Sequence, residues 1–222
     1  MKLAGAAGIE VPETRLVHRR QIESLPENVW PSGEEFAYAV QRFDRGPGRK
    51  LIHIEDLAQV RGFYPEDKYL GTYETVAALV FRRRDVESLR EFARRLAFCI
   101  LIGNGDAHLK NWSLIYRDPR LPTLSPAYDL VATEVFRPVE WGSEDLALRF
   151  GRAKAFDSIS RRTFDVLDKA LGAKAELGDV VQTLVQRVVE NWPLAEELLA
   201  AETEARNKLS TLIRHRAERL LR

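Results

Sequence analysis

The residues best suited to chemistry lie in the middle of the chain, within Gly103–Asn111. Four residues separate Asp106 from Asn111 there, and a further carboxylate, Asp129, follows shortly afterwards. A carboxylate can accept the proton of an attacking hydroxyl, while an amide oxygen and a second carboxylate are the oxygen ligands that Mg²⁺ prefers. A lysine near the base, here Lys110, can neutralise negative charge that develops on a transferred group. These residue types at this spacing indicate phosphoryl transfer assisted by Mg²⁺.

The spacing alone leaves a second interpretation open. The Asp-x₄-Asn spacing is that of the catalytic loop of protein kinases, but it also arises by chance in unrelated chains. The glycine-rich start of the segment could equally form a tight turn in which Asn104 and Asp106 bond the backbone.

The element that must position these residues is a helix predicted over 86–101. Its apolar residues recur at intervals of three and four, which places an apolar stripe along one side. The run 98–102 is apolar all round, so the helix is expected to be central and buried, and to stop at Gly103. Regular helical spacing then disappears over 103–150, where short strands are expected at 113–116 and 146–150. Long irregular segments inside a compact domain usually carry function.

The region before the central helix is predicted to contain strands and short helices, whereas the C-terminal region is predicted to be helical. Before the central helix we expect a helix end at residues 3–8, a hairpin of strands 14–18 and 35–43 across a mobile polar loop at 19–34, and short helices at 54–61 and 73–82. After it we expect helices at 161–171 and through 180–192, and a last helix from Ala195 onward.

Charge and composition exclude several classes of protein. The chain of 222 residues has 34 Lys and Arg against 33 Asp and Glu, which gives a formal charge of +1 and no bulk attraction to nucleic acid or anionic membranes. The six Lys and Arg within 206–222 are interpreted as a solvated helix face rather than a nucleic-acid surface. Cys99 is the only cysteine, which precludes an internal disulfide and fits a reducing compartment. No apolar run could span a bilayer, and no signal peptide is evident, so we expect a cytoplasmic protein.

The combination of motifs is more specific than any one of them. Gly103–Asn111 followed by Leu124–Val131 resembles the catalytic and metal-binding loops of HipA-type serine/threonine kinases, the toxin kinases of bacterial toxin–antitoxin systems. Val40–Arg45 resembles the hinge strand where that family holds adenine, and His53–Gln59 with Lys68-Tyr69 resembles the segment that follows it. The resemblance extends over nearly the whole chain.

The resemblance implies an α+β fold, mainly α. The expected architecture is a protein-kinase-like C-terminal lobe preceded by a short remnant of the N-terminal lobe, made of a helix end and a β-hairpin. Residues 1–48 would form the N-lobe remnant with the hinge strand, and residues 49–222 the HipA-like C-terminal lobe.

The resemblance also implies catalytic and metal-binding roles. Asp106 would be the catalytic base. Lys110 is expected as a second catalytic residue for the charge reason given above rather than from the resemblance. Asn111 and Asp129 would bind Mg²⁺ against the phosphates of ATP.

The same resemblance implies a nucleotide site. His108 and Tyr128 stand at matching motif positions and would line that site, while Gln41 and Phe43 would offer hinge backbone groups to the adenine edge. The family usually carries Glu at position 41, so the change to Gln preserves a backbone contact but not necessarily a side-chain contact.

Part of the family's active site has no counterpart in the sequence. The resemblance implies a phosphate-covering loop and a strand lysine, yet the chain contains neither G-x-x-x-x-G-K-[ST] nor G-x-G-x-x-G. Gly46-Pro47-Gly48 is interpreted as a turn. We therefore expect an N-terminally truncated kinase that transfers the ATP γ-phosphate to a protein hydroxyl weakly or not at all by itself.

Two alternatives remain open. The chain could be the C-terminal half of a split kinase whose other lobe is a separate chain, or a non-catalytic module that binds an antitoxin or a nucleic-acid partner. The partners that the resemblance implies are a protein substrate such as an aminoacyl-tRNA synthetase and a HipB-like DNA-binding antitoxin.

Overall fold

The computed structural model describes residues 1–22, 26–30 and 33–222, and its central element is helix α4 (Val86–Ile102). Asp85 caps the helix by accepting a hydrogen bond of 2.9 Å from the backbone N–H of Ser88. Phe92 and Leu96 are fully buried, as are most other residues on the helix. The expected central, buried helix is therefore confirmed.

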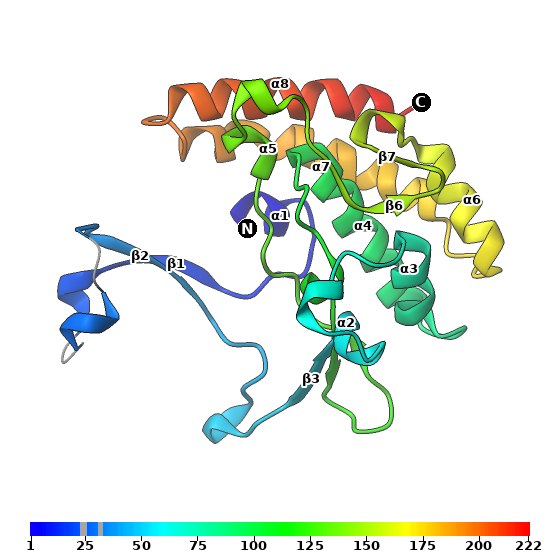
Figure 1. Ribbon diagram of the computed structural model, residues 1–222, viewed down its shortest axis with the longest axis horizontal. Coiled ribbons are helices and arrows are strands. Elements are labelled where there is room, and N and C mark those ends of the chain that lie inside the picture. The colour runs from blue at the N-terminus through cyan, green and yellow to red at the C-terminus, as the bar shows by residue number, and fades with distance from the viewer. Residues whose placement is uncertain (23–25, 31–32) are drawn as a thin grey trace.

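Further helices cover α4 on several sides. The helices α3 (Tyr73–Phe81), α7 (Leu177–Glu197) and α8 (Thr203–Leu220) pack directly against it. Two more, α1 (Lys2–Ala6) and α6 (Arg161–Leu171), pack against α7. Figure 1 shows α7 and α8 lying across one side of this helical body, with α3 on the other side of α4. The resulting core holds the irregular segment that follows α4 in place.

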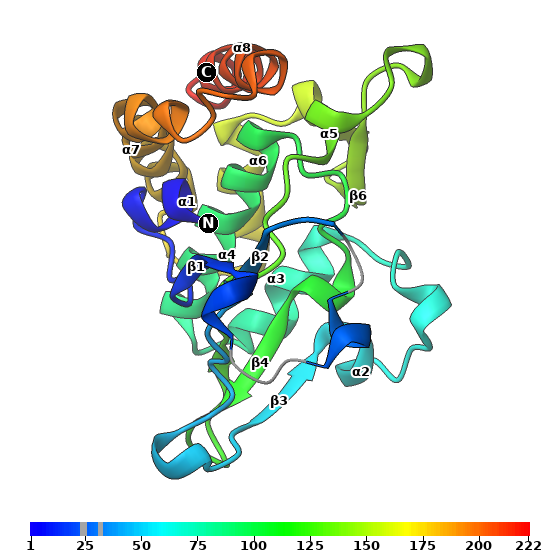
Figure 2. The same ribbon diagram turned by 90° about the vertical axis from the view of Figure 1, so that its left-hand side faces the viewer.

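The strands within 1–22, 26–30 and 33–222 form three small antiparallel sheets. They pair β1 (Thr14–His18) with β2 (Phe36–Val40), β3 (His53–Asp56) with β4 (Ser113–Tyr116) and β5 (Thr123–Leu124), and β6 (Asp145–Phe150) with β7 (Ala153–Ala155). The β1–β2 hairpin extends away from the helical body in Figure 1, and Figure 2 looks from the side of the hairpin, which there lies in front of the body. With the short helices α2 (Leu57–Val60) and α5 (Thr133–Phe136), the fold is mainly helical α+β.

Most of the expected elements are present, including the 14–18 hairpin strand, the helix at 73–82 and the strands at 113–116 and 146–150. The turn at Gly46-Pro47-Gly48 is also present, as part of a short 3₁₀ segment. The expected mobile loop at 19–34 falls partly on residues 23–25 and 31–32, which lie outside the described residues. None of the described helices has the length and apolar character needed to cross a membrane.

The prediction of a helix over 54–61 is wrong for the first half of that range. Residues His53–Asp56 form β3 because Ile54 pairs with Ile115 of β4, and this pairing outweighs the local helical pattern. Asp56 then caps the short helix α2 by accepting a hydrogen bond of 2.9 Å from the backbone N–H of Gln59.

The prediction of a single last helix that begins at Ala195 is also wrong. α7 continues to Glu197, and the chain reverses before α8 begins at Thr203. The reversal lets α8 pack on both α7 and α4, and the Trp192 indole donates a hydrogen bond of 2.9 Å to the Ser210 hydroxyl. Part of the basic character of α8 serves the fold, because Lys208 donates to the backbone oxygen of Val135 and Arg216 is buried.

The C-terminal end of α4 is closed by Gly103 and a buried ion pair. Gly103 adopts left-handed angles (φ 71°, ψ 48°) that favour glycine. Arg216 of α8 donates to Glu134 of α5 at 2.5 Å and to the backbone oxygen of Ile100 at 3.1 Å. A Cβ atom on residue 103 would come within 2.7 Å of the Glu134 carboxylate and 2.9 Å of the Arg216 guanidinium. The ion pair therefore lies directly against the turn that leads into the irregular segment.

Gly103→Ala is expected to destabilise the protein much more than Gly172→Ala. Both glycines end helices with positive φ (71° and 61°), but a Cβ on residue 172 would meet no atom of the described part of the chain within 4 Å. Gly172→Ala should cost about 1 kcal/mol from backbone strain. Gly103→Ala should cost about 3 kcal/mol because it also displaces a buried ion pair. Urea unfolding midpoints measure both values, and equal losses would contradict this account of the α4 terminus.

Candidate active site

One buried side chain, Asn104, joins the two motifs that the sequence singled out. Its backbone N–H bonds the Cys99 oxygen at 2.9 Å, and its side chain is almost completely buried. The amide oxygen accepts from the backbone N–H of Asp106 at 3.1 Å, and the amide nitrogen donates to the backbone oxygen of Asp129 at 3.4 Å. Asn104 therefore fixes the loop of Asp106 relative to the loop of Asp129.

The loop is also held from the core side at Ala107. Its backbone oxygen accepts hydrogen bonds from the Tyr73 hydroxyl at 3.1 Å and from the Trp112 indole at 3.2 Å. Both aromatic side chains are buried against each other. The backbone next to Asp106 is therefore fixed against the core.

Asn111 and Asp129 meet side chain to side chain. The Asn111 amide nitrogen donates to Oδ2 of Asp129, and the Asn111 amide oxygen is buried without a hydrogen-bond partner among the described residues. Asp129 is held at φ 56°, an uncommon backbone conformation that Asp tolerates better than most residues. The pair presents one unsatisfied amide oxygen and one carboxylate.

These donors fit a magnesium ion better than a transition metal. Within 1–22, 26–30 and 33–222 there is no group of three or more His, Cys, Asp or Glu residues that could hold a metal by itself. Mg²⁺ commonly takes one or two protein oxygens and completes its shell with waters and phosphates. The orphaned oxygen of Asn111 and the carboxylate of Asp129 match that donor set.

Asp106 contacts a tyrosine and a histidine. The Tyr69 hydroxyl donates to Oδ1 of Asp106 at 2.5 Å, and Nε2 of His108 lies 3.8 Å from the same oxygen. The rings of Tyr69 and His108 meet edge to face at 5.2 Å. Burial, followed by the hydrogen bond to Asp106, raises the pKa of Tyr69 to about 12, so its phenol keeps its proton. Burial lowers the pKa of His108, which favours the neutral imidazole near neutral pH.

Four of the residues that the sequence assigned line one cavity. It has a volume of about 370 Å³, lies between the residues after β2 and the β3–β4 pair, and is lined in part by Gln41, Phe43, Lys110 and Tyr128. The rings of Phe43 and Tyr128 lie 5.8 Å apart at 31°. Tyr128 donates to the Lys110 backbone oxygen at 2.8 Å, and burial raises its pKa to about 12. His108 is not among the residues that line this cavity.

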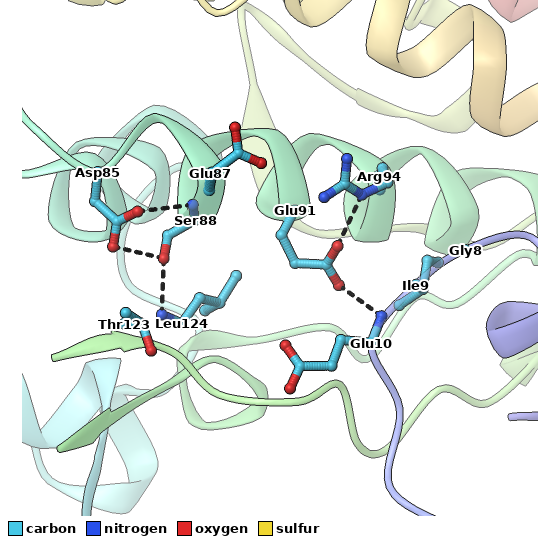
Figure 3. Close-up of a pocket in the computed structure, with 10 residues that line it drawn as sticks. All are labelled: Gly8, Ile9, Glu10, Asp85, Glu87, Ser88, Glu91, Arg94, Thr123 and Leu124. Carbon is cyan, nitrogen blue, oxygen red and sulfur yellow. Dashed lines mark hydrogen bonds and ion pairs between the residues drawn. The ribbon is translucent and has the colours of Figure 1, made fainter. Parts of the chain in front are cut away.

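A second cavity lies beside the N-terminal half of α4 and contains none of the assigned residues. It has a volume of about 520 Å³ and is lined by carboxylates that include Glu10, Glu87 and Glu91 (Figure 3). The cation there, Arg94, already donates to Glu91 at 2.8 Å. An excess of carboxylates repels phosphate groups, so this cavity is poorly suited to a nucleotide.

Sequence reasoning missed the role of Tyr69 and only partly anticipated that of Asn104. Tyr69 precedes Asp106 by 37 positions, and no local spacing links the two. The turn interpretation already had Asn104 bonding the backbone, as it does at Asp106, but the bond to the backbone oxygen of Asp129 is a long-range contact that the motif does not predict.

Comparison with known proteins gives the family. Residues 1–192 match the model of the HipA-like C-terminal domain. The chain is 39% identical over 95% of its length to Y4dM, a candidate kinase of Sinorhizobium fredii, and covers 51% of that protein. It is 31% identical over 67% of its length to a candidate kinase of Haemophilus influenzae, and covers 43% of it. The chain thus spans about half the length of these curated relatives.

A solved structure has the same fold. The structure of HipA from Shewanella oneidensis, determined with HipB and operator DNA, aligns with the whole chain and 54% of its own length at a TM-score of 0.77. The sequence identity is 24%, so this likeness concerns the fold alone. On the family match, the chain belongs to the HipA-like C-terminal domain family.

Proposed function

We propose that this chain is the C-terminal lobe of a HipA-type serine/threonine protein kinase that uses Mg²⁺ and ATP. In this proposal residues 49–222 form the kinase-like lobe, and residues 1–48 form the hinge part that precedes it. The observation that carries the proposal is the network around Asn104, which joins the loop of Asp106 to that of Asp129 while Asn111 contacts Asp129.

Each assigned residue has a chemical role in this proposal. Asp106, whose side chain is 48% exposed, accepts the proton of the acceptor hydroxyl. Asn111 and Asp129 hold Mg²⁺, which when bound neutralises charge on the phosphates of ATP. Lys110 lies at the cavity where it can approach the transferred phosphoryl group.

The cavity of about 370 Å³ supports an adenine site at the hinge. The backbone after β2, at Gln41 and Phe43, offers groups to the adenine edge, and the Phe43 and Tyr128 rings supply apolar faces. His108 acts beside Asp106, where its neutral, buried ring excludes water from one side of the carboxylate.

A second proposal, that the chain works together with another polypeptide, is supported by another groove beside the hairpin. The groove has a volume of about 540 Å³ and lies between the hairpin and helices α7 and α8, with Leu16, Tyr38, Trp192 and Leu209 in its lining. Leu16 and Tyr38 pair across β1 and β2 and are 69% and 56% exposed. Isolated two-stranded hairpins are marginally stable, so a lobe or an antitoxin packed there would complete the sheet.

Mg-ATP is expected to stabilise the chain against thermal unfolding, and Asp129→Ala is expected to remove that effect. At ten times the dissociation constant, the nucleotide should add about 1.4 kcal/mol to the free energy of unfolding. Differential scanning fluorimetry with and without Mg²⁺ measures the shift. Glu190→Ala, an exposed carboxylate on α7, is the matched control and should keep the shift. A shift that survives in Asp129→Ala would contradict the metal-binding role of Asp129, and the absence of any shift would favour the non-catalytic module.

Asp106→Asn is expected to separate binding from transfer. Loss of a general base typically costs about 10²- to 10⁴-fold in rate, whereas the nucleotide shift should persist because Asp129 and Asn111 are unchanged. Transfer from γ-labelled ATP by residues 1–222 alone is expected to be weak, since no Gly-rich phosphate loop is in the sequence. Glu190→Gln serves as the control. Equal labelling by Asp106→Asn and the wild type would contradict the role of Asp106.

A further inference from the structure

The Tyr69 hydroxyl occupies the place where a kinase base would receive its substrate. It donates to Oδ1 of Asp106 at 2.5 Å, the geometry that an acceptor hydroxyl needs for deprotonation. We propose that Tyr69 is an internal occupant of the acceptor-hydroxyl position and must leave Asp106 before a substrate hydroxyl can be activated. This inference rests on the proposed function, because Asp106 is a catalytic base only if the chain belongs to a kinase.

The contact lies at the surface, where a substrate could replace it. The side chain of Asp106 is 48% exposed and Tyr69 is 45% exposed. The residues around Tyr69 project outward, since Tyr64 is 73% and Leu70 is 55% exposed. A hydrogen bond on such an exposed segment can open without disrupting the core.

The charged groups around the phenol favour the closed contact in the resting protein. Asp106 and Glu144 both stabilise the protonated phenol, and Lys68 lies over the tyrosine ring with its ammonium 4.9 Å from the ring centre. The ring also packs edge to face on His108. A phenol that keeps its proton remains a hydrogen-bond donor, so it mimics the acceptor rather than serving as a second base.

A purely structural role for Tyr69 and a blocking role predict opposite changes in the rate of phosphoryl transfer. If the phenol only held the Asp106 carboxylate in a productive orientation, removing its hydroxyl would lower the rate of phosphoryl transfer. If the phenol blocks the acceptor position, removing it raises the rate. The direction of the change therefore separates the two roles.

The test compares Tyr69→Phe with the wild type in Mg²⁺-dependent hydrolysis of γ-labelled ATP, where water is the acceptor. Breaking a hydrogen bond to a charged carboxylate should raise the rate by about tenfold. The affinity for Mg-ATP, measured by thermal shift, should stay unchanged. Tyr64→Phe is the matched control, because Tyr64 belongs to the same exposed segment, and it should behave as the wild type. Asp106→Asn combined with Tyr69→Phe should lose the gain.

The inference is overturned if Tyr69→Phe hydrolyses ATP no faster than the wild type. This includes the case in which neither protein hydrolyses ATP at all. Binding of Mg-ATP distinguishes this failure from failure of the proposed function. If Mg-ATP binds but Tyr69→Phe gives no gain, only the role of Tyr69 is refuted. If neither protein binds Mg-ATP, the kinase proposal fails and the inference about Tyr69 fails with it.

Discussion

The arrangement of the candidate site depends on one buried amide, that of Asn104. Its oxygen holds the backbone of Asp106, and its nitrogen holds the backbone of Asp129, which follows Asn104 by 25 positions. Hydrogen bonds in a buried setting are costly to leave unmade, so both loops must stay in register with the end of α4. The backbones of Asp106 and Asp129 are thereby tied to one side chain, and the Asn111 side chain contacts Asp129.

The helical body supplies the rigidity on which this network depends. The Glu134–Arg216 ion pair ties α5 and α8 to the last turn of α4, and buried Tyr73 and Trp112 both hold the backbone oxygen of Ala107. These contacts hold the loop from the core side, and Lys110 from the same segment lines the cavity next to Tyr128. Binding and catalytic residues often lie on irregular loops that a rigid, packed scaffold positions.

Much of this fold could be read from apolar spacing, and the rest depends on distant contacts. The α4 stripe and its stop at Gly103 are local signals, and so are the hairpin strands. The strand at His53–Asp56 exists because Ile54 meets Ile115, which the local pattern does not encode. The reversal before α8 depends on packing against α4 and α7. Within the site, the motif spacing indicated Asp106, Asn111 and Asp129, whereas the contact from Tyr69 arises only in the folded chain.

The central claim is that Asn111 and Asp129 hold a divalent ion beside the hinge cavity. Paramagnetic broadening of backbone amide NMR signals by Mn²⁺ with a non-hydrolysable ATP analogue tests it most directly. The account predicts that the amides of residues 106–111 and 128–130 broaden first, while those of Glu10, Glu87 and Arg94 at the acidic cavity stay sharp. Broadening centred on the acidic cavity would contradict the claim. So would broadening at residues 106–111 and 128–130 that does not require the ATP analogue.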